Sequence, residues 1–137
     1  MNYAIAFLYS GNSVLLVRRC NASYGNCQYS LVGGKIEPGE SGILALIREV
    51  KEEVDITLTE NDLEFVHALN RRGSESDFIA LCFKADIAGM SFKNMEPEKH
   101  DDVQLFPLDS LPANILPAHK QIIEAIAKKQ LYSEHGW

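Results

Sequence analysis

The sequence lacks long apolar runs, paired cysteines and an excess of basic residues. No stretch approaches the roughly 18 consecutive apolar residues that a membrane-spanning helix needs. The opening residues MNYAIAFLYSG have no basic region before their short apolar stretch, which favours a strand over a signal peptide. The formal charge of −6 argues against nucleic-acid backbones and anionic membranes as main partners.

The three cysteines form an odd set without the spacing of a metal motif. Six residues lie between Cys20 and Cys27, and Cys82 stands far along the chain. None of the four histidines has a finger-like spacing, so a zinc site is not expected. We therefore predict reduced thiols in a cytoplasmic protein.

Length and patterning predict one domain over residues 1–137, with an apolar fraction of 46% for its core. A hairpin is predicted around Gly11, because apolar stretches rich in β-formers flank a Ser-Gly-Asn turn. Mostly antiparallel strands with two helices indicate an α+β sandwich. Strands are expected over 2–9, 13–19, 28–32, 63–71, 78–87 and 103–106, and helices over 41–54 and from 117 to about 130.

The segment 34–56, GKIEPGESGILALIREVKEEVDI, contains the chemically informative residues. On a helix, Glu49, Glu52 and Glu53 lie within about 100° of one another, beside a separate apolar stripe. Clustered carboxylates repel, and a divalent cation such as Mg²⁺ neutralises that repulsion through hard oxygen ligands. An isolated acidic triplet is more often a solvated helix face, so its neighbours decide between the two interpretations.

Four neighbouring residues favour the metal site. Arg48 stands four positions before Glu52 and can hold that carboxylate in place. Gly33 and Gly34 follow a predicted strand, where bare backbone can approach a ligand or present a carbonyl. Glu40 lies near the helix start, where a carboxylate interacts favourably with the helix dipole.

These residues resemble the Nudix box, G-x5-E-x7-R-E-U-x-E-E-x-G-U, in which U is a bulky aliphatic residue. The match runs through Gly34, Glu40, Arg48-Glu49, Val50, Glu52-Glu53 and Ile56. One position departs, since Asp55 stands where the box has glycine. That glycine ends the helix in a left-handed conformation, which Asp tolerates better than most residues. We expect Asp55 to cost some stability and to affect chemistry little.

The resemblance extends beyond the box to the MutT-like branch of the family. It includes VRR with its polar loop, LVGGKIEPGES, EPEKHDDVQLFPLDSLP, and the final YSEHGW. The resemblance implies a Nudix-type α/β/α sandwich with a mixed, mostly antiparallel sheet and two main helices, formed by one Nudix hydrolase domain.

By resemblance, the chain would hydrolyse a nucleoside diphosphate linked to another moiety, using Mg²⁺, with Mn²⁺ as a substitute. The metal ligands implied are the carboxylates of Glu49, Glu52 and Glu53 and the carbonyl of Gly33. Arg48 would orient these carboxylates. Bound metal ions bridge phosphate oxygens and lower the pKa of the attacking water.

A general base must still accept a proton from that water. In some family members the general base is a glutamate of the box, here Glu53 or Glu49, and in others it is a glutamate of a loop after the box. The loop option is Glu98, with Glu96 close by. We predict Glu98 as an additional metal ligand or base, against the alternative of a solvated loop charge.

Phosphate contacts are expected from Arg19 and Lys35. Arg18 and Arg19 alternate along a predicted strand, so only one can face the cleft, and we favour Arg19. Tyr29 and Phe106 could stack on a base, although a core position is the preferred interpretation for both.

The leading functional hypothesis is a MutT-like pyrophosphohydrolase that converts a nucleoside triphosphate to a monophosphate and pyrophosphate. The alternatives are a nucleotide-sugar or ADP-ribose pyrophosphatase and a non-catalytic nucleotide-binding Nudix domain. A short chain without an N-terminal extension slightly favours the first, and the complete set of box carboxylates argues against the last. We expect a small nucleotide as partner, no membrane and no nucleic acid, and we leave a homodimer open.

Overall fold

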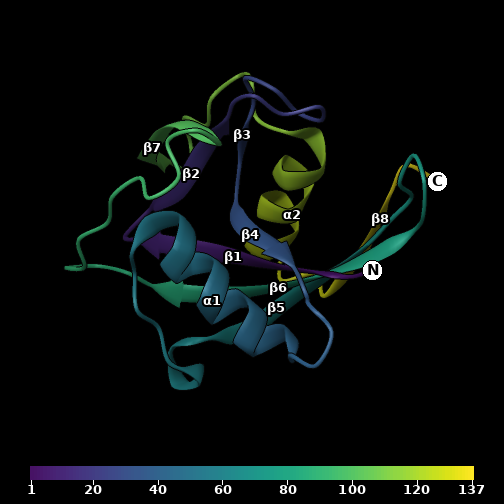
Figure 1. Ribbon diagram of the computed structural model, residues 1–137, viewed down its shortest axis with the longest axis horizontal. Helices are drawn as coiled ribbons and strands as arrows, with labels where there is room; N and C mark the ends of the chain where they lie inside the picture. The colour runs from purple at the N-terminus through teal and green to yellow at the C-terminus, as the bar shows by residue number, and fades with distance from the viewer.

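The computed structural model describes residues 1–137. Eight strands and two α-helices make up the chain, with a short 3₁₀ turn at Glu60–Asp62 (Figure 1). The helices are α1 (Gly42–Val54) and α2 (Pro117–Ala127). The strands are β1 (Tyr3–Ser10), β2 (Ser13–Arg19), β3 (Tyr29–Ser30), β4 (Val32–Lys35), β5 (Glu64–Arg71), β6 (Phe78–Asp86), β7 (His100–Pro107) and β8 (Tyr132–His135).

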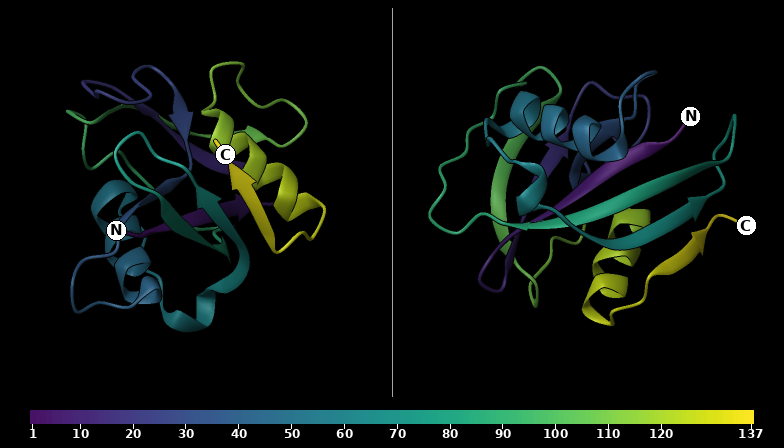
Figure 2. Two further views of the ribbon diagram at one scale, coloured as in Figure 1. Left: turned by 90° about the vertical axis from the view of Figure 1, so that its right-hand side faces the viewer. Right: turned by 90° about the horizontal axis from the view of Figure 1, so that it is seen from below.

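The strands form one mixed sheet between the two helices. Its main order is β3-β2-β1-β6-β5-β8, while β4 pairs with β1 and β7 pairs with β2. The β1–β6 and β5–β8 pairs are parallel, and the remaining strand pairs are antiparallel. In the right-hand view of Figure 2, α1 lies above the sheet and α2 below it. The predicted α/β/α sandwich is confirmed.

Strand β1 shows why both faces of the sheet are covered. Successive side chains of a strand point to opposite faces. Ala4, Ala6 and Leu8 join the core under α1, whereas Ile5 and Phe7 join the core under α2. A strand buried on both sides needs a continuous apolar run, which the N-terminal sequence provides.

Helix α1 ends where the sequence predicts and begins at Gly42, one residue later than predicted. The Ser41 side chain accepts a hydrogen bond from the Leu44 N–H at 3.2 Å, which caps the first turn. The helix ends at Asp55, whose backbone is left-handed at φ 59° and ψ 35°. The expected left-handed conformation at the departing box position is therefore present, with the Lys51 ammonium 2.7 Å from the Asp55 carboxylate.

The structure corrects the predicted elements at four further places: three boundaries and one strand that was not predicted. The strand expected over 28–32 is two strands separated at Leu31, because the Leu31 N–H donates to the His119 side chain and not to a neighbouring strand. The last helix ends at Ala127, before the predicted 130. Strand β7 begins at His100, three residues earlier than predicted, since it pairs with β2 as far as Arg19.

The fourth correction is β8, which was not predicted. Its four residues pair in parallel with β5, and Ser133 Oγ lies 2.7 Å from Nε2 of the buried His67.

Neither α-helix is long and apolar enough to cross a membrane. Cys20, Cys27 and Cys82 all have free thiols.

Candidate active site

A cavity of about 860 Å³ lies beside the predicted metal site and extends across four strands. It passes from β4 over β1 and β6 to β5, a span of about 14 Å at the usual strand spacing. Its first end is lined by Gly33, Gly34, Glu49 and Glu53. Its second end is lined by the aromatic, basic and apolar side chains of Tyr24, Leu69, Arg71, Phe78, Leu116 and His119.

The two glycines of β4 are required by close contacts. A Cβ at Gly34 would overlap the Glu49 carboxyl, and a Cβ at Gly33 would collide with the backbone carbonyl of Ala4 on β1. The Gly33 N–H donates to Glu53 Oε2 at 3.2 Å. Glycine at these positions therefore lets α1 place two carboxylates directly against the strand.

Burial makes the ionised forms of Glu53 and Glu49 electrostatically unfavourable. Glu53 is 8% exposed, and the Glu49 side chain is 15% exposed. Burial raises the pKa of Glu53 well above its usual range, and the neighbouring Glu49 charge raises it further. Burial also raises the pKa of Glu49. A divalent cation between them would offset this cost, because it favours both ionised forms.

The residues present fit an Mg²⁺ site completed by the substrate. Among His, Cys, Asp and Glu side chains, no three or more are gathered in an arrangement that could hold a metal ion. Mg²⁺ commonly takes only one or two carboxylates from the protein and the rest of its shell from phosphates and water. Glu49 and Glu53 are the two carboxylates placed to supply that protein share.

Arg48 joins the carboxylates into one network. Its Nη2 donates to Glu40 Oε1 at 2.5 Å and to the Lys35 carbonyl at 3.1 Å. Its Nη1 donates to Glu49 at 2.9 Å and to Glu52 at 3.3 Å. The contact with Arg48 lowers the pKa of Glu40, and the contact with Glu40 raises the pKa of Arg48. This geometry suits the orienting role predicted for Arg48.

Glu52 is less enclosed than its two neighbours. Its side chain is 51% exposed, and it is absent from the lining of the cavity. Arg48 holds it at the rim, on the carboxylate edge of α1 that the helical spacing predicts.

The loop before β7 places Glu96, and not Glu98, near the helix carboxylates. Neither glutamate lines the cavity, but Glu96 is half-buried whereas Glu98 is exposed. The Glu96 charge adds to the effect of burial in raising the pKa of Glu49 and of Glu53. The loop is attached to the end of α1 by the Met95 N–H, which donates to the Glu53 carbonyl at 3.1 Å.

Of the two neighbouring arginines of β2, only Arg19 lines the cavity, as the alternation of side chains along a strand predicts. Arg19 and Lys35 line the cavity. Arg18 lies outside the cavity lining, where its Nε is 2.7 Å from an Asp101 carboxylate oxygen. It also lies over the Tyr29 ring, 5.7 Å from the centroid.

Tyr29 and Phe106 belong to the core, as preferred. Tyr29 is buried, and its ring meets Phe106 edge-on with centroids 4.9 Å apart. Its hydroxyl donates to Asp102. Neither ring lines the cavity, so neither is placed to stack on a substrate there.

The second end of the cavity was missed by sequence reasoning. The Arg71 guanidinium lies 4.9 Å from the Tyr24 ring centroid and 5.8 Å from that of Phe78. Arg19 contacts the same loop, because its Nε donates to the Tyr24 carbonyl at 3.0 Å. These residues come from separate segments and form no motif, so only the pairing of β5 with β6 and the path of the loop over 20–27 could have indicated them.

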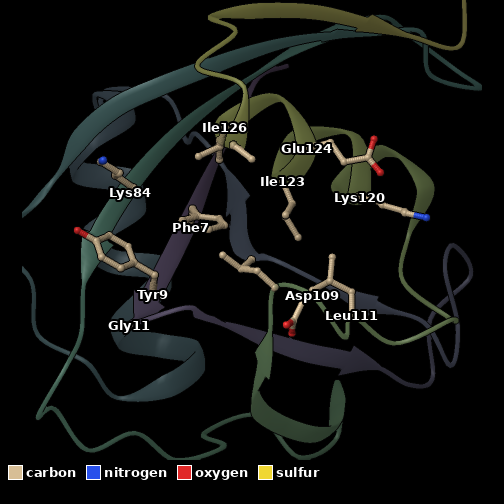
Figure 3. A pocket seen from close by; sticks show the side chains of 12 residues that line it. Phe7, Tyr9, Gly11, Lys84, Asp109, Leu111, Lys120, Ile123, Glu124 and Ile126 are labelled. Carbon is tan, nitrogen blue, oxygen red and sulfur yellow. The ribbon is translucent and has the colours of Figure 1, made fainter.

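A second cavity of about 580 Å³ lies where α2 meets β1, and shares no lining residue with the first (Figure 3). Phe7, Ile123 and Ile126 contribute apolar walls. Its two carboxylates, Asp109 and Glu124, are exposed. Buried carboxylates that could support catalysis therefore line only the larger cavity.

The NUDIX domain model matches residues 2–126 of the chain. The chain belongs to the Nudix family. It is 30% identical over 113 residues to an ADP-ribose pyrophosphatase of Methanocaldococcus jannaschii, covering 82% of this chain and 64% of that protein. It is 34% identical over 132 residues to the NAD-capped RNA hydrolase NudC of Pseudomonas aeruginosa, covering 96% of this chain and 44% of that protein. The chain thus spans about half to two thirds of these relatives.

Solved structures agree on the fold. A MutT NUDIX hydrolase from Burkholderia pseudomallei superposes with a TM-score of 0.81 at 22% identity, covering 90% of this chain and 95% of that one. The Nudix domain of Shewanella oneidensis NrtR, complexed with ADP-ribose, gives 0.71 at 22% identity, covering 95% and 87%. At 22% identity these two structures show the fold alone. Nudix hydrolases generally use a divalent metal ion.

Proposed function

We propose that this Nudix hydrolase cleaves the diphosphate linkage of a nucleoside diphosphate derivative with Mg²⁺, and that a nucleoside triphosphate is its leading substrate. The observation that carries the proposal is the pair of buried carboxylates, Glu49 and Glu53, at one end of a cavity long enough for a nucleotide. Cationic side chains border the same end.

In this proposal, Glu49, Glu52, Glu53 and the Gly33 carbonyl hold the metal. When bound, Mg²⁺ offsets charge on the phosphate oxygens and lowers the pKa of the attacking water. Arg48 keeps Glu49 and Glu52 oriented through its two hydrogen bonds from Nη1. Mn²⁺ would occupy the same oxygen ligands.

The proton of the water passes to a carboxylate of this site. Glu53 suits that role among the box residues, because it lines the cavity and its carboxylate is held by the Gly33 N–H beside the proposed metal site. Glu49 is the box alternative. From the loop, Glu98 remains the prediction of the sequence, while the position of Glu96 supports Glu96 instead.

Arg19 and Lys35 would bind the phosphates that leave or remain. Both line the cavity, and Lys35 follows directly on the two glycines beside the carboxylates. Arg19 can form a bidentate contact with phosphate, whereas Lys35 acts as a point charge.

An ADP-ribose or related dinucleotide pyrophosphatase is the second candidate. It is favoured by the relatives, one named for ADP-ribose and others for NAD-capped RNA. The absence of a nucleic-acid partner stays a prediction, and capped RNA therefore belongs in the assay. A purely nucleotide-binding role is disfavoured, because every carboxylate of the box is present.

A substrate panel tests the proposal. Nucleoside triphosphates, ADP-ribose, nucleotide sugars, NAD and NAD-capped RNA are incubated with Mg²⁺, Mn²⁺ or a chelator, and the products are separated. We expect a monophosphate and pyrophosphate from a triphosphate, with the highest kcat/KM in this class, and no turnover with the chelator. Preference for ADP-ribose would select the second candidate, and metal-independent turnover or none at all would overturn the proposal.

A further inference from the structure

His119 connects the first turn of α2 to the backbone between β3 and β4. It lines the larger cavity and is half-buried. The Leu31 N–H donates to His119 Nδ1 at 2.9 Å. The same hydrogen bond separates β3 from β4, so the imidazole is held in place by the fold itself.

That hydrogen bond determines the tautomer of the ring. A backbone N–H can only donate, so Nδ1 must present its lone pair, and the proton of a neutral imidazole resides on Nε2. Burial, together with the positive charges of Arg71 and Arg19, lowers the pKa of His119 to about 3, so the ring is neutral near pH 7. Nε2–H makes no hydrogen bond within the protein, which leaves a free donor at the cavity.

We propose that His119 is a specificity-determining residue whose Nε2–H donates to a ring nitrogen or carbonyl oxygen of the substrate base. The inference rests on the proposed function only in taking the ligand to be a nucleotide. It assigns the nucleoside to the second end of the cavity, away from Glu49 and Glu53.

The surroundings of His119 suit a base better than a phosphate. Leu31, Leu69 and Leu116 line the cavity with apolar groups, and the rings of Tyr24 and Phe78 offer flat surfaces near Arg71. Bases favour such apolar and aromatic walls with a few fixed polar groups. A neutral donor distinguishes an acceptor from an amino group at that edge of the base, because two donors cannot pair.

Binding of two non-hydrolysable ligands tests the inference without turnover. Nucleoside monophosphates and ribose 5-phosphate are titrated into wild type, His119→Phe and Lys120→Ala. Lys120 is the matched control, since it is the next residue of α2 and lines the other cavity. We expect His119→Phe to weaken the best-bound monophosphate about tenfold, the usual effect of one lost hydrogen bond, and to leave ribose 5-phosphate unchanged.

The outcomes separate this inference from the activity. Equal losses for both ligands would indicate a phosphate or structural role and would overturn the inference, as would unchanged monophosphate affinity or no monophosphate binding by wild type. Binding that depends on His119 in a chain that hydrolyses nothing would retain the inference and remove the proposed function.

A second measurement uses wild type alone and does not depend on the variant folding. Imidazole ¹⁵N spectra should show His119 protonated at Nε2 and unprotonated at Nδ1, and a bound monophosphate should shift the Nε2 signal. A proton on Nδ1, or an Nε2 signal indifferent to the ligand, would contradict the assignment.

Discussion

The two ends of the larger cavity are built in different ways. The carboxylate end comes almost entirely from one continuous segment, in which β4, a short loop and α1 follow each other within the 23 residues 32–54. The second end combines the loop over 20–27, strands β5 and β6 and helix α2. Local spacing therefore encodes the reaction class, whereas tertiary assembly determines which substrate is accepted.

The largest effect should come from removing charge at the carboxylate end. Glu53→Gln and Glu52→Gln should each lower kcat by about two orders of magnitude or more, because a metal ligand is lost while the shape is kept. Glu53→Gln should also retain or raise the melting temperature, since burial of its charge is unfavourable. Near-native activity with Mg²⁺ in either variant would show that the metal assignment is wrong.

The loop carboxylates test how far the carboxylate end extends beyond the box. Glu96→Gln should lower kcat about tenfold, and Glu98→Gln should lower it less, because only the Glu96 charge reaches Glu49 and Glu53. The pH–rate profiles of both variants are the decisive measurement. A larger loss in Glu98→Gln, with an altered profile, would restore Glu98 as the loop base or ligand.

At the second end of the cavity, His119 should make the free energy of unfolding depend on pH. The pKa of His119 is lowered to about 3 in the fold, while an unfolded histidine titrates near pH 6.5. Between these values the unfolded chain binds more protons, so the free energy of unfolding must fall as pH decreases below about 6.5. Urea unfolding at pH 7 and pH 5 should show a smaller decrease in the free energy of unfolding for His119→Phe than for wild type, and equal decreases would argue against a neutral His119 ring in the fold.

The smallest effect is expected at the helix end that departs from the Nudix box. Asp55→Gly should raise the free energy of unfolding by less than about 1 kcal/mol, because glycine adopts the left-handed backbone at little cost. The exposed Lys51–Asp55 ion pair is lost and offsets part of the gain. Lys51→Ala is the control, because it removes the same ion pair and leaves Asp55 in place. If Asp55→Gly lowers the free energy of unfolding by more than Lys51→Ala does, the Asp55 carboxylate does more than pair with Lys51.

Sequence reasoning succeeded where a structure depends on neighbours along the chain. The hairpin at Gly11 and the end of α1 at Asp55 both follow from local residue preferences. Alternation along β2 also selected Arg19 over Arg18 as the cavity residue.

It failed where one segment determines the conformation of another. The break at Leu31 depends on a side chain 88 positions away, and β8 exists because β5 offers it a parallel partner. None of these contacts leaves a periodic signal in the sequence.

The most direct test of the central claim locates the metal. Mn²⁺ is added to the ¹⁵N-labelled protein at substoichiometric levels with a nucleoside monophosphate, and paramagnetic broadening of backbone amide signals is measured residue by residue. We predict the strongest broadening at Gly33, Gly34, Glu49, Glu52 and Glu53, with little at Asp109 and Glu124 beside the other cavity. Broadening centred elsewhere, or spread evenly over the acidic surface, would contradict the proposed metal site.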